Sequence, residues 1–306
     1  MYTFNKNELR TFREICLGSS TVEEVVRSTH LPQPTVYRIL ASLERKRVVR
    51  PRKGGYRESV LMSHYAHSEA LRDYLLTAWH PLESIADSKL LVLLSISSTP
   101  KTLKRISTET RLTVGTAEKY VRALDGVGMT YRKDLRVSMS PSDAGTIAFL
   151  ERFSRGADDS VISDLTDRGV ILWNEGLQFI FSTPEGRTIQ GAIPTAITAM
   201  ARFGLDFMPA QFYYHYAYWR PSLRVEDIAL HNILVDPFST RNTSYSLLLL
   251  RKTGFAATYL LEEGRNLGIE TKASDLSRYL KGEEVQDKFF PTRAEFNELC
   301  RQYHVE

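Results

Sequence analysis

The sequence predicts an α+β protein that is mostly helical and divided into several domains. Its 306 residues leave room for two or three domains, and 42% of them are hydrophobic, which is enough for packed cores. Three patterns lead to this fold class. Positions 1–60 form a helical succession that ends in a short hairpin, a second copy follows, and the later half mixes a hairpin with capped helices. We therefore expect domains at 1–60, 81–156 and 157–306, with a linking helix at 61–80.

The segment 1–60 predicts three helices followed by a hairpin. Apolar residues recur at helical spacing over 6–17, and Thr21 is placed to cap a second helix at about 22–28. Pro32 and Pro34 suit the first turn of a third helix. The buried stripe of this helix would be formed by Val36, Ile39, Leu40 and Leu43. The runs "RVVRP" and "YRESV" flank a Lys-Gly-Gly turn at 53–55 and are typical of two short strands.

This order of elements is the winged helix-turn-helix layout, in which the last helix enters the major groove of DNA. The charge distribution supports a DNA-binding role for this segment. Residues 1–60 hold 12 Lys and Arg against 6 Asp and Glu, whereas residues 157–306 hold 15 Lys and Arg against 20 Asp and Glu. The third helix offers side chains suited to base edges at Gln33, Thr35, Tyr37 and Arg38. Phosphate contacts are expected from Arg45, Lys46, Arg47, Arg50, Arg52, Lys53 and Arg57. The alternatives are a solvated basic face or a winged helix that docks a protein.

The stretch "TVEEVVRSTHLPQPTVYRILASLERKRVVRPRKGGYR" resembles the winged-helix domains of bacterial and archaeal repressors. Its pattern is similar to that of the N-terminal domain of IclR-type regulators. The resemblance covers most of the first predicted domain and implies a DNA-binding fold.

A second copy of this succession follows at a constant offset in the sequence. It aligns "LPQPTVYRILASLERKRVV" with "LTVGTAEKYVRALDGVGMT", so that Thr35 meets Thr116 and Leu43 meets Leu124. An apolar helix at 89–97 precedes it, Thr99-Pro100 is expected to start a helix through 108, and "MTYRKDLRVSMSP" predicts another hairpin. Its candidate DNA-binding residues are Thr116, Lys119, Arg122, Arg132 and Lys133. Glu118 and fewer basic residues predict weaker DNA contacts, a dimer interface or a purely structural repeat.

The rest of the chain predicts a mixed α/β domain. "VILW" and "LQFIFST" suggest a hairpin, "PEGRTIQGAIPTAITAMARFG" a helix bent near Pro194, and "AQFYYHYAYW" an aromatic strand. Capped helices are expected over "SLRVEDIALHNILVD", "SYSLLLLRKTGFAATYLLEEG", "KASDLSRYLKG" and "PTRAEFNELCRQYHV". In the linking region, an apolar side is expected from Leu61, Tyr65, Ala66, Leu71, Leu75 and Trp79.

The "TPEGR" turn and "SLRVEDIALHNIL" resemble AbiEi-type proteins, which are transcriptional regulators and antitoxins of a nucleotidyltransferase-like toxin. The resemblance implies that Thr183, Pro184, Glu185 and Arg187 form a structural turn. It carries over no catalytic residue.

No catalytic or metal-binding residue is predicted, and no cofactor. The sequence contains no GxxxxGK[ST], GxGxxG, GxSxG or HExxH motif. His64 and His67 are interpreted as a surface pair, Asp158-Asp159 as part of a linker, and His215 with His231 as core residues or, alternatively, as lining of a ligand pocket. Cys16 and Cys300 lie at opposite ends of the chain, which favours reduced thiols in a cytoplasmic protein. No hydrophobic run predicts a membrane span or a signal peptide.

These patterns favour a regulator that binds double-stranded DNA through tandem winged helices. The acidic C-terminal domain would serve for homodimerisation, for sensing a ligand or for binding a basic protein partner. The alternatives are an antitoxin-like protein that neutralises a nucleotidyltransferase-type toxin, or an enzyme that processes nucleic acids.

Overall fold

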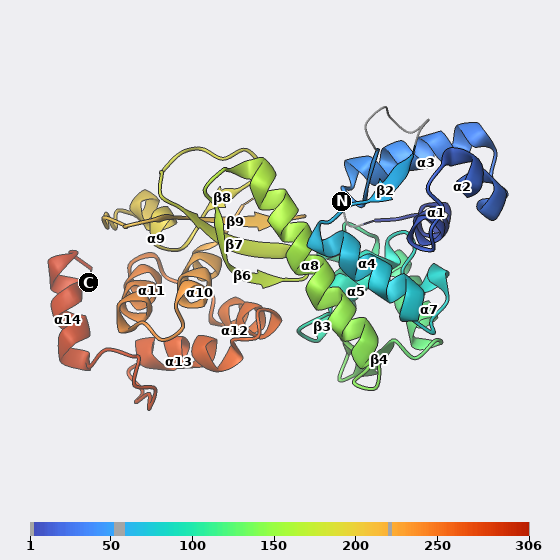
Figure 1. Cartoon of the computed structure of the whole chain (residues 1–306). Helices are drawn as coiled ribbons and strands as arrows, with labels where there is room; N and C mark the ends of the chain where they lie inside the picture. Colours follow the sequence, from blue (N-terminus) through green and yellow to red (C-terminus); the bar gives the residue numbers. More distant parts are fainter. Residues whose placement is uncertain (1–2, 52–58, 220–221, 306) are drawn as a thin grey trace. The chain divides into compact units, whose positions relative to one another are not determined.

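The computed structural model describes residues 3–51, 59–219 and 222–305, and it confirms the predicted α+β, mostly helical fold class (Figure 1). The chain divides into two compact units, Met1–Val161 and Ile162–Glu306. The boundary between the units falls inside one long helix, α8 (Ala144–Leu165). None of the helices in the described part of the chain is long and apolar enough to span a bilayer.

The first unit contains one succession of elements twice. The first copy runs through α1 (Lys6–Cys16), α2 (Val22–Thr29), α3 (Gln33–Arg45), β1 (Val49–Pro51), β2 (Val60–Met62) and α4 (Ala66–Thr77). The 3-10 helix η1 (Leu82–Ser84) leads to the second copy. This copy runs through α5 (Lys89–Ser95), β3 (Lys101–Thr102), α6 (Leu103–Thr110), α7 (Val114–Asp125), β4 (Thr130–Lys133), β5 (Arg136–Met139) and α8. The predicted internal repeat is therefore present in the structure, and each copy is a winged helix followed by one further helix.

Local chemistry explains why both copies fold alike. Thr21 and Thr102 are N-caps whose hydroxyls accept a hydrogen bond from the backbone three residues on. The helices that they start both end at a left-handed residue, His30 at φ 58° and Arg111 at φ 57°. Both pairs are separated by the same offset that aligns the two copies, so the turn between the second and third helices has the same geometry in each.

The wings differ in length. In the first, β1 pairs with β2 so that Val49 faces Met62, and in the second, β4 pairs with β5 so that Thr130 faces Met139. The first wing is therefore four residues longer. The second sheet also includes β3, in the order β3-β5-β4. In the first copy the carbonyl of Ser20 accepts a hydrogen bond from the Val60 backbone at the equivalent place.

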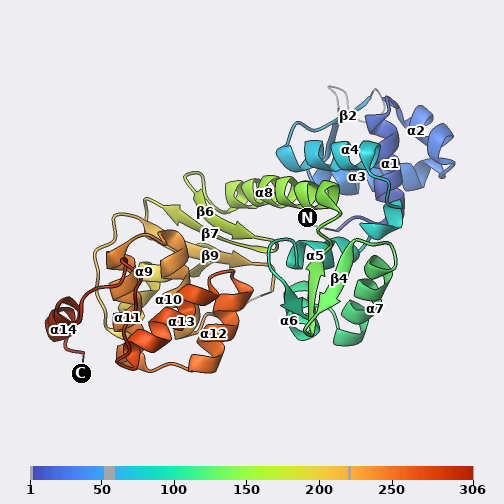
Figure 2. The same cartoon turned by 90° about the horizontal axis from the view of Figure 1, so that it is seen from below.

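The second unit is a four-stranded antiparallel sheet with helices. Its strands are β6 (Val170–Glu175), β7 (Gln178–Thr183), β8 (Ile193–Pro194) and β9 (Phe212–Ala217), in the order β6-β7-β9-β8. Its helices are α9 (Ala196–Met200), η2 (Ala201–Phe203), α10 (Val225–Val235), α11 (Thr240–Thr253), α12 (Ala257–Asn266), α13 (Glu270–Leu280) and α14 (Arg293–Gln302). Helices α10 and α11 supply apolar residues to one core, which Ile180 of β7 joins. Figure 2 shows these helices beside the sheet. The predicted hairpin, the aromatic strand and the helix break near Gly254 are confirmed.

Several expectations about elements were wrong. The segment 184–204 is mostly loop, because Gly186, Gly191 and Pro194 interrupt it, and only α9 and η2 are helical. The helix expected to start at Thr99-Pro100 begins at Leu103 with Thr102 as its cap. The second strand of the first wing begins at Val60 and so misses most of "YRESV", of which residues 56–58 lie outside the described part.

Two expectations about the segments between the predicted domains were also wrong. Asp158 lies within α8 and is buried, so this stretch is no linker. Of the predicted apolar side, Leu61, Tyr65, Ala66 and Trp79 are exposed. The buried side of α4 is formed by His67, Ser68, Ala70, Leu71, Tyr74 and Leu75.

Candidate nucleic-acid interface

Helix α3 buries one face and exposes the other, as its sequence predicts. Val36, Ile39, Leu40 and Leu43 are buried, in the 3–4 spacing of an amphipathic helix. Gln33, Arg38 and Arg45 are exposed on the opposite side, whereas Thr35 and Tyr37 are half-buried. The guanidinium of Arg38 donates to the Thr35 hydroxyl at 3.3 Å, which aligns the two side chains along the helix surface.

Three cations of the first copy are available to an external anion. Arg38, Arg45 and, on β1, Arg50 are exposed, and no carboxylate of the described residues forms an ion pair with them. Three further predicted phosphate contacts, Arg52, Lys53 and Arg57, lie outside the described residues.

Lys46 is engaged inside the domain. Its Nζ lies 2.7 Å from the Glu8 carboxylate of α1, and the side chains are only 17% and 4% exposed. It also lies 4.8 Å from the ring centroid of Phe4. Burial alone would raise the pKa of Glu8, but hydrogen bonds from Lys46, Ser42 and the Asn5 backbone hold this pKa below its ordinary value. Glu8 is therefore ionised at neutral pH and ties the end of α3 to α1.

Arg47 is engaged in a similar way. It has a left-handed backbone at φ 59°, and its guanidinium donates to the carbonyl of Ser160 in α8 at 3.0 Å. It also lies 5.7 Å from the ring of Tyr65. Lys46 thus joins α3 to α1 within the first winged helix, whereas Arg47 joins this domain to α8.

The exposed surface of α7 repeats that of α3. Arg38 and Lys119 are equivalent in the repeat and both exposed, and Thr35 and Thr116 are both half-buried. Lys119 and, in β4, Lys133 have no carboxylate partner among the described residues. Arg122 is exposed but pairs with Glu118 at 2.8 Å, and Arg132 lies 3.9 Å from the same carboxylate. The second copy therefore presents less unpaired positive charge.

The first winged helix is similar to a known family of proteins. Residues 1–63 match the family model of the sugar-specific transcriptional regulator TrmB. The first winged helix is thus a TrmB-type domain, and the match indicates a DNA-binding regulator of transcription. The predicted winged-helix fold agrees with this match, and the expected similarity to IclR-type regulators stays a prediction.

A second family model, HVO_2833_C, a C-terminal domain, matches residues 192–305. Neither model reaches the second winged helix, and neither supports the resemblance to AbiEi-type proteins. Searches of curated proteins and of solved structures find no significant match to the chain.

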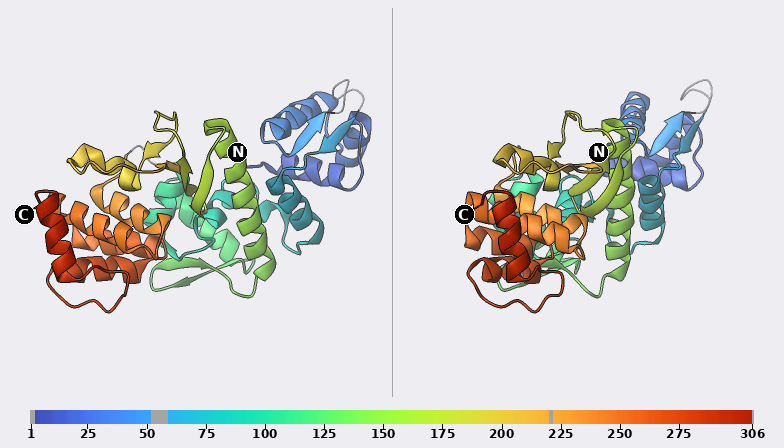
Figure 3. Two further views of the ribbon diagram at one scale, coloured as in Figure 1. Left: turned by 60° about the vertical axis from the view of Figure 1, so that its left-hand side comes forward. Right: turned by 90° about the vertical axis from the view of Figure 1, so that its left-hand side faces the viewer.

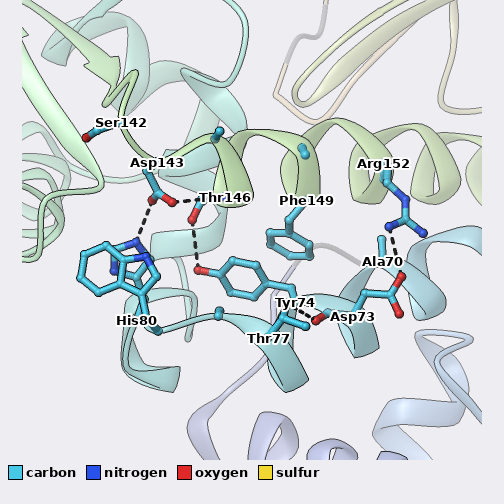
Figure 4. A pocket seen from close by; sticks show the side chains of 15 residues that line it. Ala70, Asp73, Tyr74, Thr77, His80, Ser142, Asp143, Thr146, Phe149 and Arg152 are labelled. Carbon is cyan, nitrogen blue, oxygen red and sulfur yellow. Dashed lines mark hydrogen bonds and ion pairs between the residues drawn. The ribbon is translucent and has the colours of Figure 1, made fainter.

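Helices α4 and α8, each of which follows a wing, pack against each other in antiparallel fashion. Contacts join His67 to Gly156, Asp73 to Arg152 and Tyr74 to Phe149, and a further one joins His80, just after α4, to Asp143, just before α8. Residue numbers along α8 therefore fall as those along α4 rise, which is the antiparallel order. Tyr74 and Phe149 stack with centroids 4.2 Å apart, and the Tyr74 and Thr146 hydroxyls lie 3.3 Å apart (Figure 4). A cavity of about 350 Å³ lies beside this stack, between Trp79 and Arg152.

His67 contradicts its interpretation as a surface residue. It is fully buried, with Nδ1 3.2 Å from the Gly156 carbonyl and Nε2 3.0 Å from the Lys46 carbonyl. Burial lowers its pKa, and the two backbone hydrogen bonds oppose this effect. His67 therefore joins the end of α3 to α8, a role that helical periodicity could not indicate because both partners are distant backbone atoms.

The described residues of the second unit hold no cluster of side chains suited to a metal ion. No group of three or more His, Cys, Asp or Glu side chains that could hold a metal ion occurs within residues 3–51, 59–219 and 222–305. His215 and His231 are buried with ring centroids 4.5 Å apart, as core residues between β9 and α10. In the predicted "TPEGR" turn, the Thr183 hydroxyl donates to the Glu185 carbonyl and Arg187 donates to Thr166.

Proposed function

We propose that this protein regulates transcription by binding double-stranded DNA through its first winged helix. The observation that carries the proposal is the exposed face of α3, whose cations lack carboxylate partners among the described residues, in a domain that matches the TrmB model. In this role α3 lies in the major groove, where Gln33 and Arg38 contact base edges and the half-buried Thr35 and Tyr37 border the contact.

Phosphate contacts belong to a smaller set than the basic composition suggests. Arg45 and Arg50 are exposed and unpaired with carboxylates of the described residues, and Arg52, Lys53 and Arg57 of the wing complete the proposed set. Lys46 and Arg47 are excluded from it, because their charged groups are used within the first unit.

Two neighbouring substitutions test this division. Arg45→Ala should reduce the slope of log affinity against log salt concentration by about 0.9, the value for one phosphate contact. Lys46→Ala should lower the free energy of unfolding without changing that slope. The measurement is a salt titration of binding to a duplex selected from a random pool by the intact protein, with a urea unfolding curve for each variant. An unchanged slope in Arg45→Ala, or a reduced slope in folded Lys46→Ala, would contradict the assignment.

The second unit is proposed to bind the regulatory partner of this regulator, either a ligand or a protein. Its support is the acidic balance of residues 157–306, which disfavours contact with DNA. Binding of the selected duplex should therefore persist when the acidic residues of α14, Glu295 and Glu298, are changed to Gln. Loss of duplex binding in these variants would contradict the assignment of DNA binding to the first unit and of partner binding to the second.

A further inference from the structure

The second winged helix is the largest part of the molecule that no family model assigns. It lies between the two matched regions, 1–63 and 192–305, and repeats the first winged helix element by element. The repeat extends to the surface that would meet a ligand. Positions 34, 38, 41 and 45 form the exposed stripe of α3, and positions 115, 119, 122 and 126 form the equivalent exposed stripe along α7.

The two copies are joined as the subunits of a dimer would be. An interface with two-fold symmetry uses the same surface from both partners. Helices α4 and α8 occupy the same place after their wings, and they meet in antiparallel fashion along their length. The two helices approach closely at Gly156, where a Cβ would collide with the His67 backbone nitrogen and lie 2.9 Å from the Ala66 Cβ.

This pairing places the two wings on opposite sides of the α4–α8 pair (Figures 1 and 3). Further contacts fix the arrangement within the first unit. Phe4 packs edge-on against Phe153 with centroids 6.1 Å apart, and the Phe4 carbonyl accepts a hydrogen bond from the Asp87 backbone. The first unit therefore holds two helix-turn-helix motifs in one chain, the number that a dimeric helix-turn-helix regulator obtains from two chains.

We propose that one chain binds a bipartite DNA site as a monomer, with α3 on one half-site and α7 on the other. The inference rests on the proposed function, because it extends DNA binding from the first winged helix to the second. It replaces the expected homodimer with an internal pair of domains.

The two half-sites must differ in sequence. At equivalent positions α3 carries Gln33, Tyr37 and Arg38, whereas α7 carries Val114, Glu118 and Lys119. Arginine forms a planar fork that can contact guanine in bidentate fashion, whereas lysine is a flexible point charge. The paired Glu118 also reduces the positive charge of α7. The preferred site is therefore not a palindrome, and its α7 half contributes less to affinity.

The test compares equivalent residues of the two helices in the full-length protein. Bound duplexes are selected from a random pool with the wild type, and affinity, salt slope and nuclease footprint are then measured for Arg38→Ala and Lys119→Ala. Lys281→Ala, an exposed lysine of the second unit, removes the same charge as a control. The stoichiometry follows from the mass of the complex, given a chain of 34.9 kDa.

The expected result is one chain per duplex and loss of sequence preference in a different half of the site for each helix variant. Lys119→Ala should bind roughly fivefold more weakly and reduce the salt slope by about 1, while Lys281→Ala should match the wild type. Two chains per duplex, or a Lys119→Ala variant with unchanged affinity and footprint, would overturn the internal-pair proposal while leaving the proposed function intact. If the wild type selects no sequence at all, the proposed function itself fails.

Discussion

Arg45 and Lys46 are neighbours in the chain, yet their side chains have different partners. Arg45 is exposed at the end of α3, where its Nε donates to the Ala41 carbonyl. The next residue turns inward to Glu8, which also accepts a hydrogen bond from Ser42 at 2.5 Å. Two consecutive residues at the end of α3 thus differ in role: Arg45 is an exposed cation, whereas Lys46 belongs to a structural ion pair.

Replacing Glu8 by Gln should destabilise the protein in a pH-dependent way. The folded-state pKa of Glu8 lies below its ordinary value of 4.5, so the ionised carboxylate stabilises the fold at higher pH, and this stabilisation is lost as the pH falls through the folded-state pKa. At pH 7 the variant should lose about 1–3 kcal/mol of unfolding free energy, because Lys46 would keep a half-buried charge without its counter-ion.

Urea unfolding at pH 7 and at pH 3.5 measures this effect. The difference between the wild type and Glu8→Gln should narrow at the lower pH. Glu151→Gln, which changes an exposed carboxylate of α8, should show little difference at either pH. If the difference in unfolding free energy between the wild type and Glu8→Gln were the same at both pH values, the Glu8 charge would not stabilise the fold.

At the scale of single residues, the sequence shows which side chains are basic. It does not show which of them are held in ion pairs or hydrogen bonds inside the first unit. Glu8 and Lys46 are 38 residues apart in the chain, and Arg47 and Ser160 are 113 residues apart, so no local pattern connects either pair. The same limit applies to His67, whose partners are the carbonyls of Lys46 and Gly156. By contrast, the exposed positions of Gln33 and Arg38 follow directly from helical periodicity.

Among the elements, the repeat was predictable because its signals are local. Caps, helix ends and apolar stripes recur within short windows of the sequence, and a fixed offset compares them directly. The segment 184–204 was not predictable in this way. Its alternation of small and apolar residues fits a helix, but Pro194 pairs with Tyr214 of β9 as part of a short edge strand.

Helix α8 shows a second limit of local patterns. The expected domain boundary after residue 156 falls inside α8, and Gly156 lies where this helix approaches α4 closely. A glycine within a helix weakens it slightly, and here the absence of a side chain allows the Ala66–His67 backbone to approach. The position therefore reflects tertiary packing, which the sequence of α8 alone does not contain.

Gly156→Ala should destabilise the α4–α8 pair by about 1–3 kcal/mol, because the added methyl group collides with backbone that cannot rotate away. Gly145→Ala is the matched control, since it lies in the same helix and its Cβ would have no neighbour within 4 Å. Chemical denaturation of both full-length variants tests the pair. Equal stability of Gly156→Ala and Gly145→Ala would show that α4 and α8 can move apart at Gly156 without loss of stability.

For the whole molecule, charge and architecture divide the chain in similar places. The basic residues concentrate in the first unit, and the acidic balance begins near its end. Each unit has its own set of buried residues, and the second contains a continuous apolar core. This division is consistent with one unit for DNA and another for a regulatory partner.

Hydrogen exchange of the intact protein should locate the DNA within the first unit. Addition of the selected duplex should slow exchange in α3, α7 and the β4–β5 hairpin, and leave Ile162–Glu306 unchanged. Repeating the measurement at about 1 M salt, where the Debye length falls to about 3 Å, should remove the protection. Protection centred on the second unit would place the DNA elsewhere.

Under the proposed binding mode, the antiparallel packing of α4 on α8 determines how promoter occupancy would depend on the amount of protein. A regulator that must first dimerise loses binding steeply on dilution, because the active species varies with the square of the chain concentration. A chain that carries both DNA-binding domains faces no such step, and its occupancy rises in proportion to concentration at low levels. Such a protein would keep control of its promoter at a few copies per cell, and each of its two domains could change sequence preference without changing the other.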